Sequence, residues 1–567
     1  MKTKFHLTFF CLILFSLVLS ACGATSPAPT AAPATSAAPA QPATSAPSAP
    51  AADTPTAAPA EPLVVLIDND EGPITPANYN TFIGYWLVGW VYDPLYIRTP
   101  DLKVVPALAT SAVPSADGLT WNITLRQGVK WHDGEPFTSK DVIFTYNFLV
   151  AAGRDKALGA IKSMEANGDN ALTITLSAPQ PFFLAESLAG NYIMPEHIWK
   201  DQKPDSGALS QFQGMIGTGA YKLTQVQPGE FYTFEANPDY YRGKPLVDKI
   251  TAKIVKDRTQ QFDQLRTKEA GAVLSSVPPA IVSYIQADTN VKLAQGSDFF
   301  NYILYINGSR KPFNDPKVRQ AISDAIDTKS LADTVLLGQG VQLPQNWYHP
   351  DLAWSINTPH VFDAAASQTA LDTAGLKDTN GDGIRELNGK NTNFGILCDV
   401  NNPVEVRTSE LLVGMLKAVG LGAHQQCLDI DSAVALIWPD FVAVPNPDYD
   451  LGIWGWSSTP QIQRGFIRIM TNCDFKGDGK YNLTGICDKT LDDYVNEFVT
   501  TIDQTRSDEL SGLIQKRFVE NLPWVPLMSP GGNFAYRPAA YDGWQYMRGT
   551  GIVTVWSFLP KEAQDIP

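Results

Sequence analysis

Residues 22–62 constrain the fold more than any other part of the chain. After Cys22 they consist almost wholly of alanine, proline, serine and threonine, with Asp53 and Glu61 as the only charged side chains and no aromatic residue. Such a segment has too little apolar surface to offset the entropy lost on ordering, and its prolines favour extended polyproline II conformations. We predict a disordered tether, so that the folded body starts at Leu63.

Residues 1–21 have the layout of a secretory signal peptide. Lys2 and Lys4 precede an apolar run, residues 9–19, which is too short and wrongly flanked for a membrane-spanning helix. The run ends in Leu-Ser-Ala-Cys, which resembles the lipobox of bacterial lipoproteins. We therefore expect export, lipidation of Cys22 and an extracytoplasmic chain held at the cell membrane by this lipid anchor. The alternative is a plain signal peptide with an incidental cysteine.

The body, residues 63–567, carries the whole negative charge of the protein. The formal net charge is −15, and residues 1–62 contain two lysines and two acids, which cancel. An acidic surface disfavours nucleic acid as a partner and suits a soluble extracellular protein. The 13 Trp, 20 Tyr and 26 Phe of the chain are enough to fill a large core and also line a cleft.

Four cysteines remain once Cys11 in the signal and Cys22 are set aside. An even number outside the cell predicts two disulfides. Cys473 and Cys487 flank a short glycine-containing loop, and we expect them to pair. Cys398 and Cys427 each lie in a strand-like stretch on either side of one predicted helix, so they could bridge neighbouring strands. No CxxC or Cys/His cluster indicates a metal site.

The region after Pro106 has readable local structure. Residues 120–125 alternate as in a strand, residues 131–134 (WHDG) form a tight turn, and Thr138 to Asp141 have the spacing of a capping box that opens a helix. Further along, Asn314 or Asp315 caps an amphipathic helix with Pro316 in its first turn, which we expect to end at Gly338.

These segments, in this order, resemble the extracellular solute-binding proteins of family 5, the group that contains oligopeptide- and dipeptide-binding proteins. Four further stretches resemble family elements in the same order: GTGAY at 217–221, NPDYY at 237–241, KPFNDPKVRQAISDAID at 311–327 and NLPWVPL at 521–527.

The resemblance implies an α/β fold of the type 2 periplasmic-binding-protein class, with two lobes joined by hinge strands plus an extra α/β domain. Lobe I would comprise residues 63–105, 216–306 and 531–567, the extra domain residues 106–215, and lobe II residues 307–530. A monomer would capture a small solute between the lobes and deliver it to an ABC transporter permease. It would perform no chemistry and need no cofactor.

Members of the family contact solute from three segments. The corresponding residues here are Tyr85, Trp86 and Trp90, then Asn301 and Tyr302, then Trp454, Trp456, Ser457 and Thr459. Flat aromatic faces suit a cleft because they bury apolar area and tolerate varied ligands. The alternative is that about half of them belong to the core, since Tyr85, Trp86 and Trp90 also have helical spacing.

One position departs from the pattern of the peptide-binding members. They carry an aspartate three residues after the aromatic at Trp456, where it holds the α-ammonium of the peptide, and this chain has Thr459 there. A hydroxyl cannot replace a carboxylate as an ammonium anchor. The solute is therefore a peptide or an oligosaccharide-like compound.

Catalytic motifs are absent from the sequence. It contains no G-x-S-x-G, no H-E-x-x-H and no glycine-rich phosphate loop, and its six histidines are scattered. A cell-surface hydrolase on a tethered α/β scaffold and a sensory receptor for a solute remain the alternatives to a transport component.

Residues 378–386 match the first half of a calcium-binding loop. Asp378, Asn380 and Asp382 fall at positions 1, 3 and 5, Ile384 offers a carbonyl at position 7, and Glu386 follows, but position 12 is a glycine. The segment predicts either a structural calcium site or an ordinary Asp/Asn/Gly turn.

Overall fold

The structure is a computed structural model that describes residues 61–79, 82–153, 157–204, 215–439, 446–473 and 481–564. All described residues belong to one compact unit. The predicted signal peptide, Cys22 and most of the predicted tether lie outside the described residues. Within those residues, no helix is both long and apolar enough to cross a membrane.

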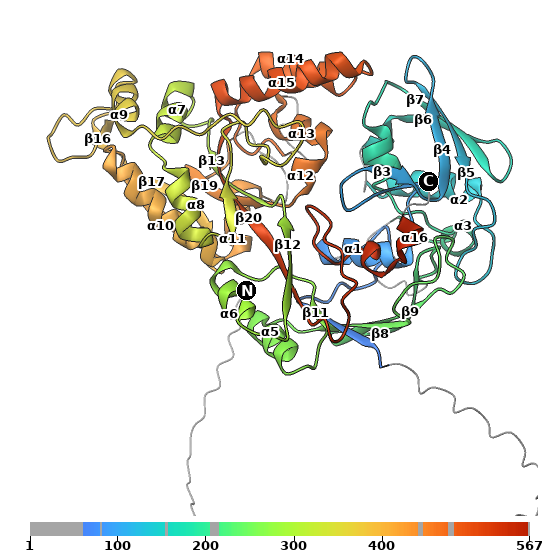
Figure 1. The fold of residues 1–567 in the computed structure, drawn as a ribbon. Helices are drawn as coiled ribbons and strands as arrows, with labels where there is room; N and C mark the ends of the chain where they lie inside the picture. Colours follow the sequence, from blue (N-terminus) through green and yellow to red (C-terminus); the bar gives the residue numbers. More distant parts are fainter. Residues whose placement is uncertain are drawn as a thin grey trace, which may run out of the picture. The chain divides into compact units, whose positions relative to one another are not determined.

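A twelve-stranded sheet runs through the body (Figure 1). Its strands, in spatial order, are β18 (Ala423–Leu428), β17 (Phe394–Asp399), β19 (Leu451–Trp456), β13 (Asn301–Ile306), β20 (Trp524–Tyr536), β11 (Ala272–Val273), β1 (Leu63–Ile67), β10 (Lys249–Ile254), β9 (Phe231–Ala236) and β8 (Tyr221–Gln227), with β12 (Lys292–Ser297) and β14 (Gly340–Gln342) also paired to β20.

Strand β20 joins the two halves of this sheet. Its first residues pair with β13, with Tyr302 opposite Met528, and its last residues pair with β12, from Gly531 to Tyr536. Strands β12 and β13 are consecutive in the chain, so two chain segments cross side by side between the halves. We call the half with β1 and β8 to β12 the first lobe, and the half with β13, β14 and β17 to β19 the second lobe.

Each lobe has its own hydrophobic core. The first is built around Val65, Trp90 and Phe234, and the second around Leu304, Ile322 and Ile396. The helices that cover the sheet are α1 (Phe82–Val91), α5 (Arg258–Arg266), α6 (Pro279–Gln286), α7 (Pro316–Asp324), α8 (Thr328–Leu336), α9 (Ala364–Thr373), α10 (Pro403–Ala418), α11 (Ile430–Ile437), α12 (Thr459–Ile462), α13 (Ile467–Thr471), α14 (Lys489–Phe498), α15 (Gln504–Asn521) and α16 (Lys561–Gln564).

A separate four-stranded antiparallel sheet forms a smaller domain with its own core. Its strands, in spatial order, are β4 (Ala109–Pro114), β5 (Thr120–Leu125), β7 (Ala171–Leu176) and β6 (Ile161–Ala166). The helices of this domain are α2 (Ser139–Ala151), the π-helical turn η2 (Phe183–Leu188) and α3 (Glu196–Trp199). The predicted strand at 120–125 and the capping box are confirmed, because the Thr138 N–H donates to the Asp141 carboxylate at 2.8 Å. Short hairpins β2 (Tyr96–Arg98) with β3 (Val104–Pro106) and β15 (Glu386–Leu387) with β16 (Lys390–Asn391) complete the strands of the described residues.

The predicted helix after Asp315 begins as expected but ends earlier. The Asp315 carboxylate accepts the Lys317 N–H at 2.8 Å, which confirms it as the N-cap. The helix does not continue to Gly338. Helix α7 stops at Asp324, and Asp327 caps a second helix, α8, by accepting the Ser330 N–H. The apolar periodicity of the two short helices is nearly continuous, which is why the sequence favoured one long helix.

Both predicted disulfides are present. Cys398 and Cys427 lie opposite each other in the parallel strands β17 and β18, with Cα atoms 4.4 Å apart. Helix α10 connects these two strands, as the sequence indicated. Cys473 and Cys487 pair with a Cα distance of 4.9 Å.

Candidate functional site

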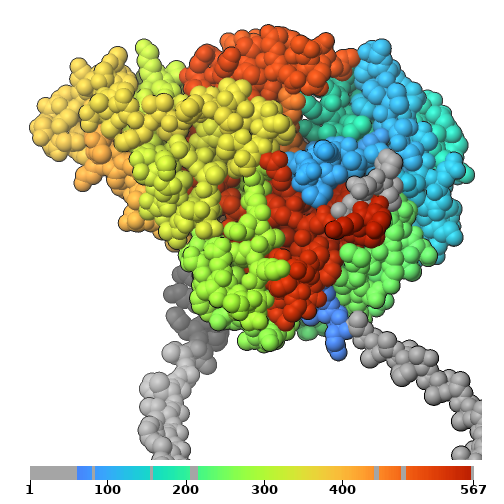
Figure 2. Space-filling model, in the orientation of Figure 1, coloured from blue at the N-terminus to red at the C-terminus, as the bar shows by residue number. Residues whose placement is uncertain are grey.

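The second lobe meets the small domain across a contact that we call the seam. It is formed by Phe182 and Glu186 of the small domain and by Arg464, Gly465 and Phe498 of the second lobe. The Glu186 carboxylate accepts the Gly465 N–H at 3.1 Å, the rings of Phe182 and Phe498 lie 5.1 Å apart, and Arg464 covers both rings. In Figure 2 the orange surface of α14 and α15 approaches the cyan and teal surface of the small domain. Elements distant in sequence thus close on each other here.

A small cavity lies in the wall of the first lobe next to η2. Its volume is about 50 Å³. It is lined by Tyr85, Trp86, Gly89, Pro94, Ile97, Arg98, Ala189, Tyr192, Met547, Thr554, Val555 and Trp556. A water needs roughly 10–15 Å³ of such space, so the cavity takes a few waters or one terminal group of a larger ligand.

Helix α1 contributes Tyr85 and Trp86, two of the predicted site residues, to this lining. The Tyr85 ring lies edge-on to Trp86 at 5.0 Å and 5.4 Å from the ring of Tyr192. Trp90, one turn further along α1, is fully buried and donates its indole N–H to the Val553 carbonyl at 2.6 Å. Trp90 is therefore a core residue.

Strand β19 presents Trp454 and Trp456 on one face of the second lobe. Trp456 is half-buried, and its indole N–H donates to the Tyr305 hydroxyl at 2.9 Å. The rings of Tyr481 and Phe466 surround it at 5.8 and 6.2 Å. The same hydrophobic cluster includes Phe182, which belongs to the seam. Trp456 thus stands on the face of the sheet that turns toward the seam.

The other predicted site residues have different surroundings. Asn301 is fully buried; its side-chain oxygen accepts the Trp347 indole N–H at 3.0 Å, so it holds the loop after β14 against β13. Tyr302 is on the opposite face of the sheet, where its hydroxyl accepts the Asn402 amide and burial raises its pKa to about 12. Ser457 is half-buried just after β19, and Thr459 starts α12. None of these four lines the cavity beside α1.

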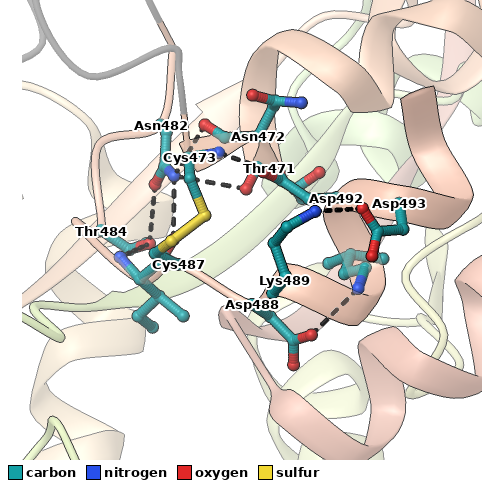
Figure 3. The surroundings of a disulfide bond; sticks show 12 residues. Thr471, Asn472, Cys473, Asn482, Thr484, Cys487, Asp488, Lys489, Asp492 and Asp493 are labelled. Atoms are coloured by element: carbon teal, nitrogen blue, oxygen red, sulfur yellow. Dashed lines mark hydrogen bonds and ion pairs between the residues drawn. A yellow bond between two sulfur atoms is a disulfide. The ribbon is translucent and has the colours of Figure 1, made fainter.

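A disulfide joins Cys473 to Cys487, and Figure 3 shows the surroundings of this bond. Cys473 follows α13, and its N–H donates to the Asp492 carboxylate at 3.0 Å. Asn482, directly after Tyr481, donates its amide to the Ile486 carbonyl at 2.9 Å. The bond between Cys473 and Cys487 therefore holds the segment that positions Tyr481 against α13 and α14.

A second hollow of about 300 Å³ follows the crossing strands β12, β14 and β20. It is lined by Gln295, Gly296, Ser297, Gly338, Gln339, Gly340, Val341, His349, Asp351, Ser529, Pro530, Gly531, Gly532 and Asn533. Burial lowers the pKa of His349 to about 4, so this side chain is neutral at physiological pH. Its lining contains five glycines and no Trp, Tyr or Phe side chain, so this hollow lacks the broad apolar faces of the cavity beside α1.

The predicted calcium loop is held by its own hydrogen bonds. The two Asp378 oxygens accept the N–H groups of Gly381 and Gly383, and the Glu386 carboxylate accepts those of Thr379 and Asn380. Across the described ranges, no group of three or more His, Cys, Asp or Glu side chains is arranged to hold a metal ion. Residues 378–386 are therefore better described as a turn than as a calcium site. This applies also to Asn380, Asp382 and Ile384, which the sequence suggested as calcium ligands.

The sequence did not point to most of the cavity lining. Arg98, Tyr192, Met547 and Trp556 come from three distant segments, and none belongs to a motif. Only the fold brings them together, so no local signal in the sequence could have identified them.

The model of the bacterial extracellular solute-binding proteins, family 5, matches residues 103–477, about two thirds of the chain. The chain belongs to this family. Among its relatives, the oligopeptide-binding protein AppA of Bacillus subtilis is 29% identical over 381 residues, covering 65% of this chain and 68% of AppA. A probable di/tripeptide-binding protein of Pseudomonas aeruginosa is 26% identical over 471 residues, covering 78% and 84%.

Solved structures of family 5 proteins have the same fold. AppA of Bacillus subtilis in complex with a nonapeptide superposes with a TM-score of 0.72 at 23% identity, covering 88% of this chain and 99% of AppA. NikA of Brucella suis in complex with Fe(III)-EDTA superposes with a TM-score of 0.77 at 22% identity, covering 88% of this chain and 100% of NikA. The predicted two-lobed type 2 fold is confirmed. As a family 5 member, the chain is an extracytoplasmic, non-enzymatic solute-binding component of an ABC transporter.

Proposed function

We propose that this family member is a monomeric lipoprotein, anchored through an acylated Cys22, that captures a peptide between its lobes and presents it to the permease. The observation that carries the proposal is the seam, at which the second lobe closes on the small domain next to a cavity lined by aromatic side chains and one arginine. Closure of two lobes over a bound solute is an established switching mode of binding proteins.

The division into lobes is part of this proposal. The predicted bounds are 63–105, 216–306 and 531–567 for lobe I, 307–530 for lobe II and 106–215 for the extra domain. We propose this division with one change: β13 pairs with β19, and its Leu304 and Ile306 belong to the core of the second lobe, so lobe II begins at residue 301. The change of partner along β20 supports the boundary at 530, because Pro530 pairs with β14 and Gly531 pairs with β12. Two core clusters support the same division, because the cluster around Leu304 lies in the half of the sheet with β13 and the cluster around Ile123 consists mostly of residues of the extra domain.

A peptide is the first candidate for the solute because the relatives are named as oligopeptide- and di/tripeptide-binding proteins. An oligosaccharide-like solute is the second candidate. It is favoured by the half-buried rings of Trp454 and Trp456 on one face of β19 and by Thr459, which cannot bind an ammonium group as an aspartate does.

The test is a thermal-shift titration of the purified body with peptides of two to nine residues and with oligosaccharides. A solute that binds the native state stabilises it by RT ln(1 + [L]/Kd), about 2.7 kcal/mol at a hundredfold excess over Kd. Mass spectrometry of the co-purified solute would identify the natural class. Failure of every solute to raise the melting temperature, together with turnover of any of them, would contradict the proposal.

The anchor is tested in cells with a fatty-acid analogue that labels acylated proteins. The full chain is expected to carry the label and sediment with membranes, and Cys22→Ser to lose both properties. Cys11→Ser is the matched control, since Cys11 belongs to the predicted signal peptide. Equal labelling of the chain and of Cys22→Ser would contradict lipidation at this position.

A further inference from the structure

Arg98 is the only charged residue in the lining of the cavity beside α1. It is the last residue of β2 and lies opposite Val104 of β3. Its carbonyl accepts the indole N–H of Trp556 at 2.8 Å, and Trp556 also lines the cavity. The backbone of Arg98 is thus held from two sides.

The guanidinium group of Arg98 has no protein partner in the parts of the chain that the structure describes: no hydrogen bond or ion pair reaches it. Burial lowers the pKa of Arg98, and the nearby Tyr85 and Glu186 oppose this effect. Glu186 is farther away than an ion-pair contact, and its carboxylate accepts the Gly465 N–H. An arginine remains charged under these conditions, since its pKa stays far above neutral.

Two other buried arginines, Arg319 and Arg385, have carbonyl partners for their guanidinium groups. Arg319 donates to the carbonyls of Asn521 and Phe313, and Arg385 donates to the Val419 and Leu376 carbonyls. A poorly solvated cation without such partners is costly. Arg98 is thus a half-buried cation at the cavity wall that an incoming anion can pair with.

The cavity contains no acid that could compete for this cation or bind an ammonium group. None of its twelve lining residues is Asp or Glu. The second-lobe position at which peptide-binding members carry an aspartate is Thr459. The cavity therefore offers a positive charge, Arg98, where a site that binds an ammonium group would offer a negative one.

We propose that Arg98 binds a carboxylate group of the solute, so that this protein anchors its ligand by an anion. The planar guanidinium can donate two parallel hydrogen bonds to a carboxylate, and the cavity has room for a group of that size beside Tyr85 and Trp86. This inference rests on the proposed function, because it names the recognised group of the captured solute. The carboxylate comes either from the C-terminus of a peptide or from an Asp or Glu side chain.

The test is calorimetric titration of the chain with a randomised pool of tripeptides in four forms: free or amidated at the C-terminus, and with Glu or Gln at one position. We expect the chain to lose roughly ten- to a hundredfold in affinity when the recognised carboxylate becomes an amide, as for a hydrogen-bonded charge. The form that causes the loss identifies the source of the carboxylate.

Arg98→Met is expected to reduce affinity for the free-acid form by the same factor and to bind the amide form as the unaltered chain does. Arg98→Lys keeps the charge without the planar fork, and we expect an intermediate affinity; it also serves as the test if Arg98→Met does not fold. Lys103→Met, at an exposed lysine of the same hairpin, is the control and should bind every form normally.

Two results would overturn the inference, and they are distinguishable. If the chain binds tripeptides, but neither amidation nor Arg98→Met changes the affinity, the carboxylate anchor is wrong and the capture function stands. If the unaltered chain binds none of the four peptide forms, the peptide proposal fails, and the inference fails with it.

Discussion

Glu186 and Gly465 are 279 residues apart in the chain, yet the Glu186 carboxylate accepts the Gly465 backbone N–H at 3.1 Å. The acceptor belongs to η2 of the small domain, and the donor belongs to η4 (Arg464–Phe466), which follows α12 in the second lobe. Because a carboxylate makes a stronger hydrogen bond than a neutral acceptor, this contact stabilises the form in which the two parts touch.

Glu186→Ala is therefore expected to favour separation of the two parts. A hydrogen bond to a charged group contributes about 1.5–3 kcal/mol, so solute affinity should fall by roughly tenfold or more. Calorimetry measures the affinity, and small-angle X-ray scattering measures the radius of gyration, which should increase. Glu135→Ala, at an exposed acid of the small domain, is the control. Unchanged affinity and radius in Glu186→Ala would show that this contact does not govern closure.

The hydrogen bond between Trp456 and Tyr305 predicts a coupled pair. Tyr305 is fully buried, so Trp456→Phe leaves its hydroxyl without its donor, and Tyr305→Phe leaves the indole N–H without its acceptor. Each single substitution should lower the free energy of unfolding by about 1–3 kcal/mol, and the double substitution by less than the sum.

Urea unfolding of the four proteins measures this coupling. Tyr494→Phe, at a half-buried tyrosine of α14 whose hydroxyl makes no hydrogen bond within the described residues, should change the free energy of unfolding by less than about 0.5 kcal/mol. Strict additivity of Trp456→Phe and Tyr305→Phe would mean that the hydrogen bond contributes nothing to stability.

Asp298 predicts a pH dependence of stability. It lies between β12 and β13, and burial raises its pKa from 3.8 to about 6. Because the native state then binds more protons than the unfolded state between about pH 4 and 6, its contribution to stability decreases as the pH rises through this window. The destabilisation is complete above about pH 6 and absent below about pH 4.

Asp298→Asn removes this titration. We expect the free energy of unfolding of the variant to exceed that of the unaltered chain by about 1–3 kcal/mol near neutral pH and by almost nothing near pH 4. Chemical unfolding at a series of pH values measures this difference. Asp239→Asn, at an exposed aspartate, should show no such difference. A gain of equal size at both pH values would mean that the Asp298 charge is not its cause.

The hydrogen bonds of the loop at residues 378–386 lead to the prediction that calcium does not change the stability of the protein. Its carboxylates already accept backbone N–H groups, and Glu386 is buried. The melting temperature should therefore be the same in excess calcium and in excess chelator. Glu386→Ala should lower the free energy of unfolding by about 1–3 kcal/mol because the N–H groups of Thr379 and Asn380 lose a charged acceptor, whereas Glu230→Ala on the surface should not. A rise in melting temperature on adding calcium would contradict this prediction and support a calcium site at residues 378–386.

The sequence alone determined what depends on neighbours along the chain or on composition. Asp315 and the pair Thr138 and Asp141 cap their helices because the required side chains lie within one turn of the donors they satisfy. Cys398 and Cys427 could be paired because two strands on either side of one helix are commonly parallel neighbours. The ordered motifs were enough to identify the family and hence the two-lobed fold.

Only the tertiary structure decided which aromatic residues are core and which face a cavity. Tyr85, Trp86 and Trp90 share one helix, but the packing of Phe558 and Phe234 buries Trp90, while Tyr192 and Trp556 leave a space beside the first two. The cavity, the unpaired charge of Arg98 and the contact of Glu186 with Gly465 all join segments separated by tens to hundreds of residues. Burial and pairing are properties of such distant neighbours, and local sequence patterns carry no information about them.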